Sequence, residues 1–122
     1  MSTLIFVTSS PDSILAWHAL GIAQSLQEKN QNFQVFFYQQ GVAAANTLNW
    51  VPDDQRQLTR EWQKLGIRLP VCVSAALARG ICDLDNAQRH KLQHSNLASG
   101  FTLVGLGELA DAVQNASRVL QF

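Results

Sequence analysis

Short apolar runs alternate along the chain with longer segments in which apolar residues recur at helical spacing. A continuous apolar run at residues 4–7 predicts a buried strand over residues 3–8, and residues 33–38 are rich in the aromatic and β-branched side chains that strands favour. Three further strands are predicted at residues 68–73, 101–104 and 117–122.

The segment after the first run predicts an amphipathic helix. Ser10 is the expected N-cap and Pro11 the first helical residue, since proline has the φ angle of a first turn and no N–H to lose there. Apolar positions then recur four residues apart, which indicates one buried stripe. That predicted stripe consists of Ile14, His18, Ile22 and Leu26, with Leu15, Ala19 and Ala23 beside them on the same face.

Four further helices follow from the same spacing rules. One opens at residues 52–54, buries Leu58, Trp62 and Leu65, and ends at Gly66. A short helix spans 74–80, and residues 85–88 have the spacing of a capping box for another. A last helix follows the turn 105–107, with an apolar stripe of Leu106, Leu109, Ala110 and Val113. Residues 39–51 have no clear period and predict a loop with room for a short helical piece.

Strands that alternate with helices predict an α/β fold, because right-handed crossover helices cover both faces of a parallel sheet. We therefore expect residues 1–122 to form a single three-layer α/β/α domain with a mainly parallel sheet of about five strands. The strand order does not follow from the sequence.

Composition narrows the possible functions. Nine basic and nine acidic residues give a net charge of zero, so the chain lacks the basic surface of a direct nucleic-acid binder. The longest apolar runs fall far short of the ~20 residues that cross a bilayer. No membrane attachment and a cytoplasmic location are expected. Two cysteines ten positions apart do not form a disulfide framework, so both are expected to be free thiols.

Cys72 is the main candidate for chemistry. It ends the third predicted strand and directly precedes a run of helix formers, so amide N–H groups and the helix dipole would stabilise a thiolate there. Reactive groups of open parallel sheets lie at the carboxyl ends of strands. The sequence leaves an alternative open, in which Cys72 is a small core residue, because free cysteine is often buried.

Other candidate residues carry weaker signals. Cys82 could resolve an oxidised Cys72, although no Cys-x-x-Cys motif supports that role. The segment 105–110 matches a dinucleotide fingerprint, but it lies too near the chain end and carries Glu108 where a phosphate would bind. His90 and His94 share a helix face without completing ligands, and no feature selects His18 or another histidine as a base for Cys72. We therefore expect neither a metal nor a nucleotide cofactor.

Several blocks of the sequence together resemble one known family. The central block is Cys72-Val73-Ser74-Ala75-Ala76-Leu77-Ala78-Arg79-Gly80. The other matching stretches, in order, are 35–38, 41–42, 45–46, 62–63, 95–97, 100–103, 105–107, 118–119 and 121–122. On these blocks the chain resembles the DsrE-like sulfurtransferases over nearly its whole length. Cys82 stands where the family pattern has an aliphatic residue.

The resemblance implies a sulfur relay. It implies that Cys72 carries a persulfide and that the chain assembles with related TusB-like and TusC-like subunits. A TusA-like protein would be the sulfur donor and a TusE-like protein the acceptor, for 2-thiolation of the tRNA wobble uridine. Two alternatives stay open: a DsrE-type subunit of a DsrEFH complex in sulfur oxidation, and a noncatalytic structural subunit.

Three tryptophans also bear on partners. Trp62 fits a core stripe, whereas Trp17 lies off the predicted stripe of its helix and Trp50 lies in an aperiodic loop. Exposed tryptophans are typical of contact surfaces. Together with the zero net charge, they favour association with other chains.

Overall fold

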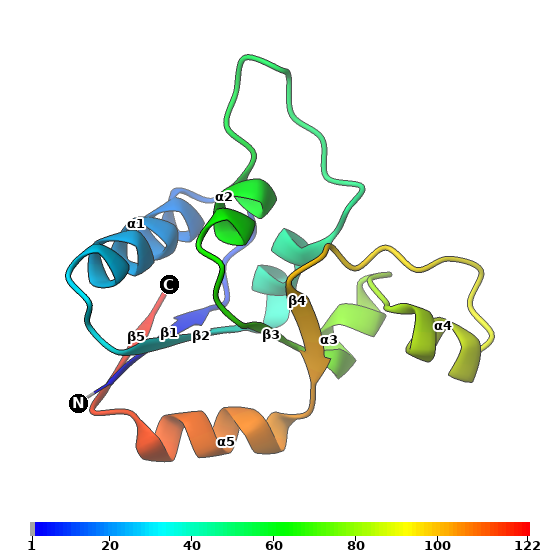
Figure 1. Ribbon diagram of the computed structural model, residues 1–122. Helices are drawn as coiled ribbons and strands as arrows, with labels where there is room; N and C mark the ends of the chain where they lie inside the picture. Colours follow the sequence, from blue (N-terminus) through cyan, green and yellow to red (C-terminus); the bar gives the residue numbers. More distant parts are fainter. Residues whose placement is uncertain (1) are drawn as a thin grey trace.

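A computed structural model describes residues 2–122. Its centre is one five-stranded sheet in the order β4-β3-β2-β1-β5, and every recorded strand pair is parallel (Figure 1). The strands are β1 (Thr3–Val7), β2 (Phe33–Phe37), β3 (Leu69–Cys72), β4 (Phe101–Val104) and β5 (Arg118–Gln121). All five predicted strands are confirmed, with ends that agree to within one or two residues.

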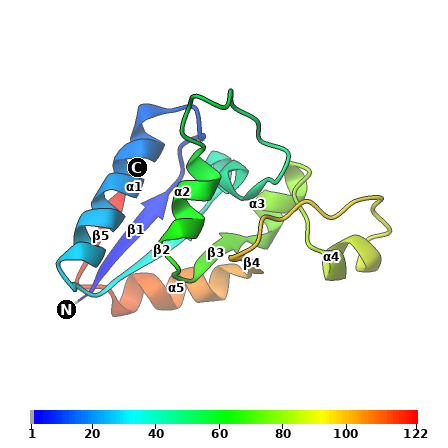
Figure 2. The same cartoon turned by 45° about the horizontal axis from the view of Figure 1, so that its top comes forward.

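Helices lie on both faces of this sheet. They are α1 (Ile14–Glu28), α2 (Leu58–Lys64), α3 (Val73–Ala78), α4 (Leu84–Arg89) and α5 (Leu106–Asn115), with a 3₁₀ helix η1 (Gln39–Ala45) after β2. Helices α1 and α2 cover one face and α5 lies on the other, while α4 projects to the side (Figures 1 and 2). The predicted three-layer architecture is confirmed, and η1 is the short helical piece that residues 39–51 had room for.

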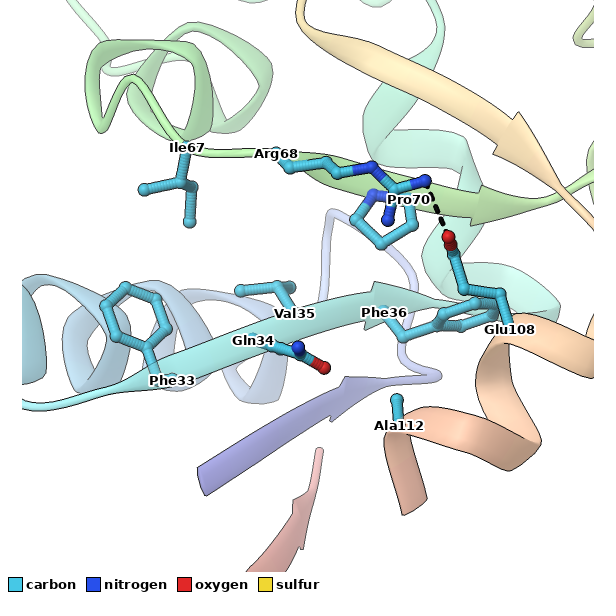
Figure 3. Close-up of a pocket in the computed structure, with 9 residues that line it drawn as sticks. All are labelled: Phe33, Gln34, Val35, Phe36, Ile67, Arg68, Pro70, Glu108 and Ala112. Atoms are coloured by element: carbon cyan, nitrogen blue, oxygen red, sulfur yellow. Dashed lines mark ion pairs between the residues drawn. The ribbon is translucent and has the colours of Figure 1, made fainter. Parts of the chain in front are cut away.

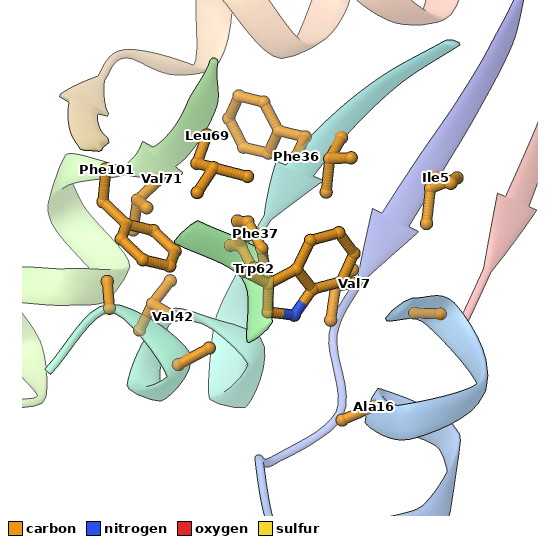
Figure 4. Packing of buried hydrophobic residues seen from close by; sticks show 14 of the residues in the cluster. Ile5, Val7, Ala16, Phe36, Phe37, Val42, Trp62, Leu69, Val71 and Phe101 are labelled. Atoms are coloured by element: carbon orange, nitrogen blue, oxygen red, sulfur yellow. The ribbon is translucent and has the colours of Figure 1, made fainter. Parts of the chain in front are cut away.

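The core extends over both faces of the sheet, and Figure 4 shows the part of it that includes Trp62 of α2 and Ala16 of α1. Trp62 is fully buried, and its ring meets Phe37 edge-on with centroids 5.2 Å apart. Phe37 in turn packs against Phe101 at 5.4 Å. The α2 stripe is thus confirmed at Leu58 and Trp62, whereas Leu65 is only half-buried.

Helix α1 begins later than predicted. Its N-cap is Ser13, whose hydroxyl accepts a hydrogen bond from the Leu15 N–H at 3.2 Å. Ser13 N–H itself donates to the Ser10 carbonyl, so residues 11 and 12 form a turn before the helix. The predicted start at Ser10 and Pro11 is therefore wrong.

The predicted face of α1 is only partly confirmed: Ala19 and Ala23 are buried and Leu26 packs partly against the core, but the large side chains at its centre are not buried. Ile14 is 69% exposed and His18 is exposed, while the buried residues are Ala16, Ala19, Leu20 and Ala23. Three of these four are alanines, and small side chains let the helix axis come close to the sheet. The prediction weighted the size of the apolar side chains, whereas close packing selected the small ones.

Three other helix predictions need correction. Helix α2 is capped at Gln57, five residues after the predicted opening at 52, and helix α4 is capped by Asp83 rather than Asp85. Asp83 Oδ1 accepts from the Asn86 N–H at 2.8 Å. In α5, Leu109 packs towards the core as predicted, but Leu106, Ala110 and Val113 are exposed, and Ala112 packs towards the core in their place.

Candidate functional site

Cys72 lies at the carboxyl edge of the sheet, as the sequence predicts. It is the last residue of β3 and the N-cap of α3. The register places it level with Val104 of β4 on one side, and Phe37 of β2 is paired with the preceding residue, Val71. The cysteine is therefore in a central strand, at the edge where ligands and reactive groups of parallel sheets gather.

Cys72 is buried, as in the alternative that the sequence left open for a small core residue. Its relative exposure is 1%, and its side chain makes no capping hydrogen bond to the N–H groups of α3. Helix α3 has six residues, too short to develop a full macrodipole. The expected position of the thiol is confirmed, but the expected amide contacts are not made in this structure.

The loop after β2 forms one wall of this edge. Gln39 has a φ of 50°, a left-handed conformation that is uncommon for a residue with a side chain and turns the chain sharply into η1. Gly41 then passes so close to the end of β1 that an added Cβ would lie 2.2 Å from the Val7 carbonyl oxygen. Helix η1 packs against both β3 and α3. No sequence signal other than glycine itself indicated this close approach.

Cys82 lies in a separate environment after α3. It is 4% exposed, and its S–H donates to the His94 carbonyl at 2.7 Å. It borders a cavity of about 210 Å³ together with Leu77, Gly80, Ile81, Leu92 and His94. Both cysteines are free thiols, as predicted.

The remaining candidates do not converge on Cys72. Residues His18, His90 and His94 are exposed, and no three His, Cys, Asp or Glu side chains within residues 2–122 are grouped to hold a metal ion. Gly105 is the N-cap of α5. In the first turn of that helix, Glu108 pairs with Arg68 at 2.6 Å. The glycine motif therefore forms a helix start with a carboxylate at the position where a dinucleotide phosphate would bind.

A cavity of about 150 Å³ lies between the sheet and α5 (Figure 3). Its lining includes Gln34, Phe36, Pro70 and the Arg68–Glu108 pair, and Cys72 is not part of it. Proline has no N–H to donate to a neighbouring strand, and β2 and β3 are in recorded register at one pair only. The cavity therefore follows from a local separation of β2 and β3 at some distance from the thiol.

Residues 46–57 form a long loop between η1 and α2 that rises above the sheet (Figure 1). Trp50 within it is 77% exposed. Arg56 lies over the Trp17 ring, 5.1 Å from its centroid, and donates to Glu61 at 2.9 Å. This hydrogen bond lowers the pKa of the Glu61 carboxyl. Trp17 is thus half-buried beneath an arginine, while Trp50 is free to contact a partner.

Comparison with known proteins places the chain in a family. The model of the DsrE/DsrF-like family matches residues 1–122. The chain belongs to the DsrE/DsrF-like family. It is 48% identical over 101 residues to the protein named Sulfurtransferase TusD from Salmonella dublin and to that from Salmonella typhi, matches that cover 80% of this chain and 79% of each relative.

A solved structure supports the fold. The crystal structure of the ychN protein from E. coli superposes with a TM-score of 0.72 over 100% of both chains at 19% identity. The family resemblance inferred from the sequence is confirmed. None of the helices in residues 2–122 is long and apolar enough to cross a membrane.

Proposed function

We propose that this chain is a sulfurtransferase of the TusD type that acts in the cytoplasm. We propose that it consists of a single domain and that this domain carries sulfur on Cys72. The observation that carries the proposal is the position of Cys72, at the junction of a central strand and a helix in a chain 48% identical to proteins named Sulfurtransferase TusD. Cys82 is assigned no part in the transfer, because its S–H is engaged with a backbone carbonyl.

The proposed chemistry is sulfur exchange between persulfides. The Cys72 thiolate attacks the outer sulfur of a donor persulfide, forming one S–S bond as the donor's S–S bond breaks. The donor leaves as a thiolate, and Cys72 becomes Cys–S–SH. An acceptor thiolate then attacks the outer sulfur and regenerates the Cys72 thiolate, with no net oxidation. Such exchange is governed by thiolate fraction, nucleophilicity and access.

Burial bears on this mechanism through access. At 1% exposure, Cys72 is shielded by the chain itself, so adventitious thiols have little access to a persulfide formed there. Transfer then requires the surrounding segments to open when the correct carrier docks. Helices η1 and α3 pack against each other beside Cys72.

The relay we propose takes sulfur from a TusA-like donor and delivers it to a TusE-like acceptor, in support of 2-thiolation of the tRNA wobble uridine. The name of the relatives supports this role over a DsrE-type role in sulfur oxidation. Retention of the cysteine supports an active subunit over a purely structural one.

Incubation with a persulfidated TusA-like donor tests the proposal. We expect the peptide that contains Cys72 to gain one sulfur atom, measured by peptide mass spectrometry after trapping of the persulfide by alkylation. The peptide that contains Cys82 serves as an internal control and is expected to remain unmodified. Sulfur on Cys82 alone, or on neither cysteine, would contradict the assignment.

We further propose assembly with TusB-like and TusC-like subunits. Three large apolar side chains are mostly exposed: Trp50 at 77%, Leu48 at 76% and Ile14 at 69%. Their exposure supports the proposal that another subunit covers them. Size-exclusion chromatography with light scattering, on the chain alone and co-expressed with both subunits, is expected to show a stable hetero-oligomer. A strictly monomeric chain that performs the full relay alone would contradict this expectation.

A further inference from the structure

We propose that Asn96 is a positioning residue for the reaction of Cys72, because its buried side chain joins the end of α3 to the end of η1. This inference rests on the proposed function of Cys72. Asn96 does not contact the thiol in the recorded hydrogen bonds, so its effect is transmitted through the two helices that it connects.

Asn96 is 8% exposed, and its side chain both accepts and donates hydrogen bonds. Its Oδ1 accepts from the Cys82 N–H at 3.0 Å. Its Nδ2 donates to the Gly80 carbonyl at 3.0 Å and to Asn46 Oδ1 at 3.1 Å. Both amide hydrogens are therefore used, each toward a different segment of the chain.

Backbone hydrogen bonds of residues 96–98 connect the same two segments as the Asn96 side chain. Its N–H donates to the Cys82 carbonyl at 2.9 Å, and its carbonyl accepts from the Thr47 N–H at 2.8 Å. Two residues later, the Ala98 N–H donates to the Ala45 carbonyl at 2.7 Å. Residues 96–98 thus form a strap between the segment after α3 and the end of η1.

Both acceptors of the Asn96 Nδ2 hydrogens lie at helix ends. Gly80 closes α3 with a φ of 75°, and Asn46 is the C-cap of η1. Helix α3 starts directly after Cys72 and is only about 9 Å long, at ~1.5 Å per residue. So short a helix moves as a unit, and a shift of its Gly80 end reaches its Cys72 end. Since η1 packs on α3, the strap holds the relative placement of two walls of the site.

The substitution Asn96→Asp tests this role with little change in shape. The new carboxylate keeps an acceptor for the Cys82 N–H but loses both donations by Nδ2. Gly80 O and Asn46 Oδ1 then face an oxygen instead of an N–H. We expect the single-turnover rate of sulfur acceptance at saturating donor to fall roughly 10-fold to 100-fold, the scale of a small misplacement of reacting groups. The half-saturating donor concentration should stay within about twofold, because donor docking is not altered.

Asn46→Asp is the matched control, since it makes the same change in charge at the other end of one hydrogen bond. Asn46 Oδ1 is recorded as an acceptor, from Asn96 Nδ2 and from the Leu48 N–H at 2.9 Å, and aspartate keeps both. The single-turnover rate of the Asn46→Asp variant is expected to exceed that of the Asn96→Asp variant by at least about tenfold. Asn46→Ala removes the acceptor without adding charge, and is expected to slow the reaction as Asn96→Asp does. The Asn46→Ala variant also tests the inference if the Asn96→Asp variant fails to fold.

A remote variant separates positioning from loss of stability. Thr3→Val removes a buried hydroxyl that accepts from Arg118 Nε at 2.9 Å, at the opposite end of the sheet. Rates are compared at a temperature where circular dichroism shows every variant fully folded. If Asn96→Asp and Asn46→Ala are no slower than Thr3→Val, the inference is overturned while the function of Cys72 stands. If the wild-type chain accepts no sulfur at all, the proposed function fails, and the role of Asn96 fails with it.

Discussion

Replacement of Cys72 by serine is expected to reduce sulfur acceptance to the background rate, a loss of roughly a thousandfold or more for removal of the reacting nucleophile. The fold should persist, because serine is nearly the size of cysteine and is a preferred N-cap. At the N-cap of α3 its hydroxyl can accept from a helix N–H, so the buried polar group need not stay unpaired. Transfer from a persulfidated donor, followed by gel and mass analysis, measures the loss.

Cys82→Ser is the matched control for that experiment. Cys82 is also buried and also a free thiol, so the two variants make the same chemical change in comparable surroundings. We expect Cys82→Ser to keep most of the transfer rate. Wild-type transfer by Cys72→Ser, or loss of transfer in Cys82→Ser at unchanged stability, would refute the assignment of the reactive thiol.

Gly41→Ala is expected to give the largest loss of stability for a single added methyl group. Its Cβ would lie 2.2 Å from the Val7 carbonyl oxygen and 2.8 Å from the Val7 carbonyl carbon. Both are backbone atoms of β1, so the clash is relieved only if η1 moves away from the sheet. Overpacking of this kind costs about 1–3 kcal/mol or more in the free energy of unfolding. Urea denaturation of the wild type and the variant measures the difference.

Gly21→Ala provides a control with the opposite sign. Gly21 lies within α1, and an added Cβ meets nothing within 4 Å. Alanine is favoured over glycine in a helix interior by roughly 0.5–1 kcal/mol. The variant should therefore be more stable than the wild type by about that amount. Equal effects of Gly21→Ala and Gly41→Ala would mean that the close approach of η1 to β1 does not govern stability.

The burial of Cys72 also changes how its reactivity is understood. If Cys72 is the reacting thiol we propose, its 1% exposure means that the segments around it must move before it meets a carrier. The sequence left open whether Cys72 is accessible or a core residue, because the packing of η1 on β3 and α3 cannot be derived from local patterns.

Local patterns predicted those parts of the fold that depend on neighbours in the chain. Short segments rich in apolar, β-branched and aromatic residues identified the five strands of residues 2–122, and the spacing of Leu58 and Trp62 identified the buried side of α2. The same reasoning only partly identified the buried face of α1, since it placed Ala19 and Ala23 correctly but also expected Ile14 and Ile22 to be buried. Which side of the helix is buried depends on how closely the helix can approach the sheet, and that favoured Ala16 and Leu20 beside the two alanines.

The sequence by itself determined the alternation of strands and helices, the place of Cys72 where a strand ends, and membership of the DsrE/DsrF-like family. These are properties of short segments and of their order along the chain. The tertiary structure alone decided that β5 returns to pair with β1, that Cys72 is covered, and that Asn96 bonds to Asn46 fifty positions away. Each of these depends on which distant segments lie side by side, and periodicity within a segment carries no information about that choice.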